Sequence, residues 1–161
     1  MEKKSINLSY AEFDSIEELK ADEQNLLDSA HQAVESSYAP YSKFHVGAAV
    51  LLEDGTIVLG SNQENAAYPS GLCAERVALF AASAQYPNVA VVAIAITVHS
   101  EKTKIDEPLP PCGACRQVMS EYEYKGGHDM KVILQGESGK ILIIDRADSL
   151  LPLTFNPNHL K

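Results

Sequence analysis

The sequence predicts an α/β fold, a three-layer α/β/α sandwich with a five-stranded mixed sheet. Three observations support this expectation. Short apolar stretches typical of strands alternate with segments of helical periodicity. Their order is one helix, two strands, a helix, a strand, a helix and two strands. The 161 residues suit a single domain. We therefore expect one domain over residues 1–161, with an N-terminal extension of uncertain structure over residues 1–18.

The first half of the chain contains one predicted helix and two predicted strands. Apolar residues recur with helical spacing from about residue 16 to residue 36, and Tyr38-Ala39-Pro40-Tyr41 ends the helix. An apolar run predicts a strand over residues 45–52, and a second strand follows over residues 56–59. The Asp54-Gly55 pair between them is typical of a hairpin turn.

The second half adds two helices and three strands. Residues 75–84 are rich in alanine and other apolar residues and predict a helix. The almost continuous apolar run over residues 89–98 is typical of a buried strand. A third helix is expected over residues 112–124. Two short strands, over residues 130–134 and 141–144, complete the predicted sheet.

The composition excludes several classes of function. The net charge is −9 and the 13 basic residues are scattered, which argues against nucleic-acid binding because phosphate contacts need clustered lysine and arginine. No window approaches the ~18 apolar residues of a membrane span. The N-terminus also lacks the apolar run of a secretory signal. We therefore expect a cytoplasmic protein that binds neither nucleic acid nor membranes.

The three cysteines lie in two short segments, each where a loop enters a predicted helix. Three cysteines cannot all pair within one chain, so a disulfide framework is not expected. A redox dithiol formed by Cys112 and Cys115 is an alternative, but it leaves Cys73 without a role. Helix N-termini favour thiolates, and three thiolates can hold Zn²⁺ with the fourth position open, as in catalytic zinc sites.

Charged residues next to the cysteines suit such a zinc site. Glu75 lies two residues after Cys73, where it can serve as a general acid/base without being a ligand. Alternatively, it is a first-turn glutamate that favours the helix dipole. Some positive charge should offset the three thiolates, and Arg76 and Arg116 are the candidates. None of the five histidines has ligand spacing to a cysteine segment.

Longer motifs surround these residues. A cysteine or histidine followed by x-Glu, and later by Pro-Cys-x-x-Cys, is the signature of zinc deaminases of nucleobases. The match extends well beyond this signature, because residues 20–155 resemble the cytidine deaminase family. The matching segments are Tyr41-Ser42-Lys43-Phe44-x-Val46-Gly47-Ala48-Ala49, Asn62-x-Glu64-Asn65-Ala66-Ala67-Tyr68-Pro69, Cys73-Ala74-Glu75-Arg76, Pro111-Cys112-Gly113-Ala114-Cys115-Arg116-Gln117-Val118 and Leu150-Leu151-Pro152-x-x-Phe155.

The resemblance implies zinc-dependent deamination of cytidine and 2′-deoxycytidine to uridine and 2′-deoxyuridine, a reaction of pyrimidine salvage. It implies that Cys73, Cys112 and Cys115 hold one zinc ion per subunit. Zinc-bound hydroxide would attack C4 of cytosine, while Glu75 moves protons to N3 and to the departing amine. Arg76 would donate to the cysteine sulfurs and offset their charge, so the resemblance selects it from the two arginines.

The resemblance also implies how the substrate is bound. Phe44 would pack against the base, the Ala74 amide would bind the pyrimidine carbonyl, and the Pro110 carbonyl would accept from the leaving amino group. Asn62 and Glu64 would hydrogen-bond the ribose hydroxyls. Their residue types suit a diol, since glutamate accepts twice and asparagine both donates and accepts. Without the resemblance, the alternative for Asn62 and Glu64 is a solvated turn, and the alternative for Phe44 is ordinary core packing at the edge of a strand.

With three cysteines as its expected zinc ligands, the chain resembles the homotetrameric branch of the family, in which neighbouring subunits complete each pocket. Tyr68 and Phe155 are then expected to reach the site of an adjacent subunit. The chain departs from the family pattern at Gln63, where an aliphatic residue is usual, and at Pro110, which replaces a small hydroxyl residue. The loop over residues 99–110 is also longer than usual.

The sequence leaves two alternative functions. A deaminase of another aminopyrimidine nucleoside, such as blasticidin S, would share the zinc chemistry, but Asn62 and Glu64 favour ribose recognition. A catalytically silent, zinc-stabilised scaffold is the second alternative, and the presence of Glu75 argues against it. We therefore predict an enzyme with a small-molecule nucleoside substrate.

Overall fold

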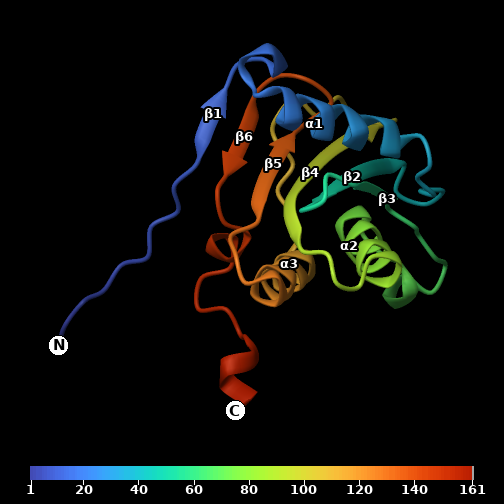
Figure 1. Cartoon of the computed structure of the whole chain (residues 1–161). Coiled ribbons are helices and arrows are strands. Elements are labelled where there is room, and N and C mark those ends of the chain that lie inside the picture. The colour runs from blue at the N-terminus through green and yellow to red at the C-terminus, as the bar shows by residue number, and fades with distance from the viewer. Residues whose placement is uncertain (161) are drawn as a thin grey trace.

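A six-stranded sheet forms the centre of the protein, in a computed structural model that describes residues 1–160 (Figure 1). The strand order is β1-β6-β5-β4-β2-β3. Strands β4 and β5 are parallel, and every other neighbouring pair is antiparallel, so the sheet is mixed as predicted. The strands are β1 (Ala11–Phe13), β2 (Phe44–Leu52), β3 (Ile57–Ser61), β4 (Val91–Ser100), β5 (Lys131–Gln135) and β6 (Ile141–Ile144).

Helices cover both faces of the sheet, which confirms the predicted three-layer arrangement (Figure 1). Helix α1 (Ala21–Val34) packs on one face, whereas α2 (Ala74–Gln85) and α3 (Gly113–Gly126) pack on the other. Within residues 1–160 no helix combines the length and the apolar character that crossing a membrane requires. Four short 3₁₀ helices occur in the described part of the chain: η1 (Ile16–Glu18), η2 (Tyr68–Ser70), η3 (Ala147–Leu150) and η4 (Pro157–Leu160).

The predicted number of strands, five, is wrong, because β1 adds a sixth at the edge of the sheet. This strand pairs antiparallel with β6, with Ala11 opposite Ile143 and Phe13 opposite Ile141. It has only three residues, and two of them are exposed. A strand this short carries no alternation that a sequence pattern can detect, and its pairing partner lies at the other end of the chain.

Side chains on β2 alternate between the two faces of the sheet. Ala48 and Val50 belong to the core beneath α2 and α3, whereas Ala49 belongs to the core beneath α1. Continuing this alternation toward the start of the strand places Phe44 on the side of α2 and α3, and His45 on the side of α1.

Helix α2 approaches β3 closely at Gly60. A Cβ atom at this position would lie 2.3 Å from the backbone nitrogen of Ala78 and 2.6 Å from the carbonyl oxygen of Ala74. Only glycine fits this contact, which fixes the first turns of α2 against the sheet. The position of the α2 N-terminus, and therefore of Cys73, depends on this packing.

Replacing Gly60 with alanine should lower the free energy of unfolding by about 1–3 kcal/mol, because the added methyl group meets backbone atoms that cannot rotate away. Equilibrium urea unfolding measures this difference. Gly126→Ala at the end of α3 is a matched control, since its Cβ would meet nothing closer than 3.5 Å. Equal stability of Gly60→Ala and the wild type would contradict the close contact between β3 and α2.

Candidate metal centre and adjoining pocket

The N-termini of two helices bring the three cysteines together. Cys73 is the N-cap of α2 and Cys112 is the N-cap of α3, while Cys115 lies in the first turn of α3. The Sγ atoms of Cys73 and Cys112 are 3.8 Å apart, and those of Cys112 and Cys115 are 3.4 Å apart. All three sulfurs lie within 4.8 Å of one another. The cysteines therefore form one cluster, as their positions before predicted helices indicated.

This cluster fits a zinc ion. Thiolates at the corners of a tetrahedron, each ~2.3 Å from zinc, are ~3.8 Å apart, close to the sulfur distances found here. Within residues 1–160 it is the one group of three or more potential ligands gathered to this degree, and it includes no histidine or carboxylate. Three ligands leave the fourth coordination position available, which is the arrangement of catalytic zinc sites.

The sulfurs differ in their affinity for protons. A hydrogen bond from Cys115, together with Arg76 nearby, lowers the pKa of the Cys73 thiol to about 5. The reciprocal bond to Cys73 and burial raise the pKa of the Cys115 thiol. Of Cys73 and Cys115, Cys73 therefore loses its proton more readily, and a metal ion would displace the proton held on Cys115.

Arg76 is the arginine that contacts the cluster. Its Nη2 atom lies 3.6 Å from Cys73 Sγ, and its buried Nε atom has no hydrogen-bond partner within residues 1–160. Arg116 is bonded elsewhere, donating to the carbonyls of Pro111 (2.8 Å) and Leu150 (2.9 Å). Of the two candidates for offsetting the sulfur charge, the geometry therefore favours Arg76.

Glu75 lies beside the cysteines but outside the ligand group. It is the second residue of α2, and only 4% of its surface is exposed. Burial, and next the charge of Cys73, raise the pKa of its carboxyl group. A carboxyl group in this environment can hold a proton at a higher pH than a solvated glutamate, as a general acid/base requires.

A cavity of about 760 Å³ opens beside the cluster. Glu75, Cys73 and Cys112 form part of its wall. Five of the residues predicted to bind substrate also line it: Phe44, Asn62, Glu64, Tyr68 and Pro110. Four further apolar or aromatic wall residues carry no role predicted from the sequence, although each is next to a predicted residue or within a matching motif: Tyr41, Val46, Leu72 and Leu109.

Asn62 holds the start of β2 in place. Its Oδ1 atom accepts a hydrogen bond from the Val46 N–H (2.8 Å), and its Nδ2 atom donates to the Phe44 carbonyl (2.8 Å). Since an amide group can make four hydrogen bonds, one N–H and one lone pair remain for a ligand. Asn62 therefore both shapes the cavity wall and presents polar atoms at it.

Glu64 holds the turn that precedes β2. Its Oε2 atom accepts hydrogen bonds from the N–H groups of Tyr41 (2.9 Å) and Ser42 (3.2 Å). Burial alone would raise the pKa of Glu64, but the hydrogen bonds from Ser42 and Tyr41 lower it. The next residue of the turn, Lys43, has a φ of 62°, in the left-handed region. Glu64 is thus a carboxylate whose Oε1 atom is free of these backbone bonds.

Two other predicted residues lie apart from the cavity wall. Ala74 is fully buried, but it is the first residue of α2, where N–H groups lack an intrahelical acceptor. Phe155 does not line the cavity of its own chain; its carbonyl accepts from Gln117 Nε2 (2.8 Å), and its ring stacks on His159. More than half of the Phe155 surface is exposed.

Comparison with known proteins agrees with this site. Residues 20–126 match the family model described as the cytidine and deoxycytidylate deaminase zinc-binding region. A cytidine deaminase from Halalkalibacterium halodurans is 46% identical over 140 residues, which cover 87% of this chain and 98% of the relative.

Solved structures are also similar. A cytidine deaminase from Burkholderia pseudomallei has a TM-score of 0.70 and 40% identity, covering 81% of this chain and 97% of its own. A cytidine deaminase from Mycobacterium tuberculosis has a TM-score of 0.65 and 33% identity, covering 84% of this chain and 98% of its own. With its three-cysteine site, the chain therefore belongs to the family that shares the zinc-binding region of cytidine and deoxycytidylate deaminases.

Proposed function

We propose that the protein deaminates cytidine and 2′-deoxycytidine hydrolytically, releasing ammonia and forming uridine or 2′-deoxyuridine, as a step of pyrimidine salvage. The observation that carries this proposal is the buried carboxyl group of Glu75 beside three clustered thiols at the wall of a large cavity. The similar proteins from three bacteria are named cytidine deaminases, which supports the same substrate.

Cys73, Cys112 and Cys115 would hold the zinc ion. When bound, Zn²⁺ supplies a Lewis acid that lowers the pKa of water at the open position. The Glu75 carboxylate accepts a proton from the water that attacks C4 of the pyrimidine. It would deliver this proton to N3, then accept the second proton from the same oxygen, now bonded to C4, and pass it to the departing amine as the C4–N bond breaks, so that one group serves as base and then as acid twice. The raised pKa of Glu75 suits this alternation, because the proton must be held between the two transfers.

Arg76 would keep the charge of the sulfur cluster in balance. Three thiolates around Zn²⁺ carry a net charge of about −1, which opposes the acidification of water. The guanidinium group, 3.6 Å from Cys73 Sγ, offsets part of that charge by donating to the sulfur.

The cavity, together with the N-terminus of α2 beside it, offers a group for each part of a nucleoside. Phe44 would pack against the base, the free N–H of Ala74 would donate to the pyrimidine carbonyl, and the Pro110 carbonyl would accept from the amino group. Asn62 and Glu64 would bind the ribose hydroxyls with the polar atoms that the turn and β2 leave unused.

We further propose that residues 1–161 form one deaminase domain that assembles as a homotetramer in the cytoplasm. Tyr68 is 76% exposed at the cavity, and Phe155 is exposed away from it, as expected of residues that meet a neighbouring subunit. The three cysteines are free thiols, which suits a reducing compartment.

Glu75→Gln should abolish most turnover while keeping the zinc. We expect kcat for cytidine to fall by about 10²–10⁴-fold, because glutamine cannot move protons. Ultraviolet spectra follow conversion of cytidine to uridine, and metal analysis measures zinc per chain. Glu121→Gln, an exposed change on α3, should retain full activity. If the wild type with zinc bound converts neither cytidine nor deoxycytidine, the proposed function is wrong.

Glu64→Gln should raise the KM for cytidine about tenfold or more, with a smaller change in kcat. The variant replaces a charged acceptor for the ribose by a neutral amide, and hydrogen bonds to charged groups are worth about 1.5–3 kcal/mol. Steady-state kinetics separates the two constants. Glu53→Gln, in the exposed β2–β3 turn, is the control. An unchanged KM would remove Glu64 from the proposed sugar site.

The tetramer predicts complementation between inactive chains. Phe155→Ala and Glu75→Gln should each lower activity when expressed alone. Co-expressed, they should regain activity, because an intact Glu75 site can then receive Phe155 from the neighbouring chain. Sedimentation of the wild type should give four times the chain mass. A monomer, or a mixture no more active than its separate parts, would contradict the shared site.

A further inference from the structure

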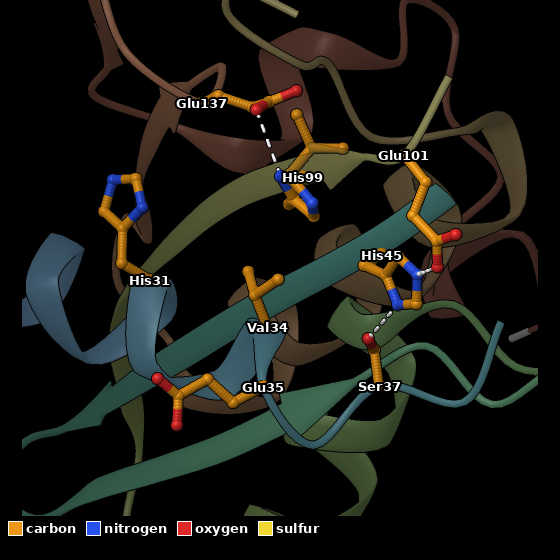
Figure 2. Close-up of a pocket in the computed structure, with 9 residues that line it drawn as sticks. His31, Val34, Glu35, Ser37, His45, His99, Glu101 and Glu137 are labelled. Carbon is orange, nitrogen blue, oxygen red and sulfur yellow. Dashed lines mark hydrogen bonds and ion pairs between the residues drawn. The ribbon is translucent and has the colours of Figure 1, made fainter. Parts of the chain in front are cut away.

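A second cavity, of about 470 Å³, lies on the α1 side of the sheet. Figure 2 shows histidines and carboxylates around it, among them His31, His45, His99, Glu101 and Glu137. Within residues 1–160 the cysteines are the sole group of three potential metal ligands within 4.8 Å of one another, so these histidines do not form a ready metal site. Their hydrogen bonds indicate a different role.

His45 is hydrogen-bonded through both of its ring nitrogens. Nδ1 lies 2.6 Å from Ser37 Oγ, and Nε2 lies 3.0 Å from Glu101 Oε1 (Figure 2). In the tautomer with a proton on Nε2, the Ser37 hydroxyl donates to Nδ1 and Nε2–H donates to the carboxylate. Ser37 belongs to the connection between α1 and β2, whereas Glu101 directly follows β4. The imidazole ring therefore joins two segments that are remote in sequence.

Both of these segments continue into the wall of the cavity beside the cysteines. The connection that contains Ser37 leads to Tyr41 and Ser42, whose N–H groups bind Glu64. The segment that begins with Glu101 leads to Leu109 and Pro110, which line the same cavity. The polypeptide thus continues from both hydrogen-bond partners of His45, on the α1 side of the sheet, to two borders of the proposed nucleoside site.

A backbone contact strengthens the connection near His45. The Glu101 N–H donates to the Lys43 carbonyl over 3.1 Å, so the two segments also meet directly. On β2, His45 stands between Phe44 and Val46, whose backbone atoms are bound by Asn62. The imidazole is therefore attached to the same short piece of backbone that carries the aromatic ring of Phe44.

The neighbouring His99 lacks this connecting role. It is opposite His45 in the β2–β4 register, with ring centroids 6.1 Å apart. Its Nδ1 atom lies 3.1 Å from Glu137 Oε2, but Glu137 is already held by the N–H groups of Ser100 and Ile105. Removing the His99 ring therefore leaves the Glu137 contacts to the loop in place.

We propose that His45 is a positioning residue for the nucleoside site: through Ser37 and Glu101 it holds the two borders of the cavity at the spacing that the substrate requires. This inference rests on the proposed function. The His45–Glu101 contact is partly exposed, and exposed pairs of this kind contribute little to global stability. The effect of His45 should therefore fall on substrate binding more than on folding.

The test replaces His45 with phenylalanine, which keeps a ring of similar size without its hydrogen bonds. We expect the KM for cytidine to rise about three- to tenfold, the change that loss of a typical hydrogen bond gives. The kcat value and the zinc content per chain should stay near those of the wild type. His45→Gln, which retains a donor and an acceptor, should recover part of the lost affinity.

His99→Phe is the matched control, since it removes an imidazole from the same face of the adjacent strand. Its KM should equal that of the wild type. If His45 only stabilised the fold, its loss would reduce the active fraction and leave KM unchanged. An unchanged KM in His45→Phe, with an active wild type, would overturn the positioning role.

Hydrogen exchange tests the contacts without reference to activity. In His45→Phe the amides of Tyr41, Ser42 and Glu101 should exchange faster, whereas in His99→Phe they should not. Unchanged exchange at these amides would overturn the inference even in an active enzyme. A wild type that deaminates neither cytidine nor deoxycytidine would instead overturn the proposed function, and the exchange data would still decide whether His45 holds the two segments.

Discussion

The meeting of two helix N-termini is the constraint on which the rest of the site depends. Cys73 begins α2 and Cys112 begins α3, so both thiols lie where helix dipoles and free N–H groups favour negative charge. Two positive helix ends repel each other unless negative charge lies between them. The sulfurs and the helices therefore stabilise each other's position, and the close contact at Gly60 holds α2 where this meeting can occur.

The residues proposed to recognise the sugar also hold the wall of the cavity. Asn62 binds the backbone of β2, and Glu64 binds the N–H groups of the preceding turn. Recognition and local structure are thus coupled, because the same side chains serve both. His45 acts on this wall from the opposite face of the sheet, where its contacts do not compete with a ligand. Because His45 supports the wall from behind, the face of the wall that lines the cavity is left to side chains that can contact the substrate.

Local patterns predicted much of the fold and the site. The strand over 141–144 has the predicted bounds, and the strand predicted over 89–98 begins two residues later, at Val91. Two features needed more than local pattern. The three residues of β1 are a strand only because β6 pairs with them, and short segments carry too little periodicity to show this. Arg76 and Arg116 both adjoin the cysteine motifs, so local spacing alone does not distinguish them, whereas their hydrogen bonds do.

The sequence by itself predicted the three cysteines as candidate zinc ligands, Glu75 as a candidate acid/base and the helices that present them, because residue type and local spacing carry these signals. Tertiary structure alone decided that Cys73 and Cys112, 39 positions apart, bring their sulfurs to 3.8 Å. It also decided the strand order and the contact of His45 with both borders of the cavity. These distances arise from the packing of segments remote in sequence, and no local pattern constrains how far apart such segments lie.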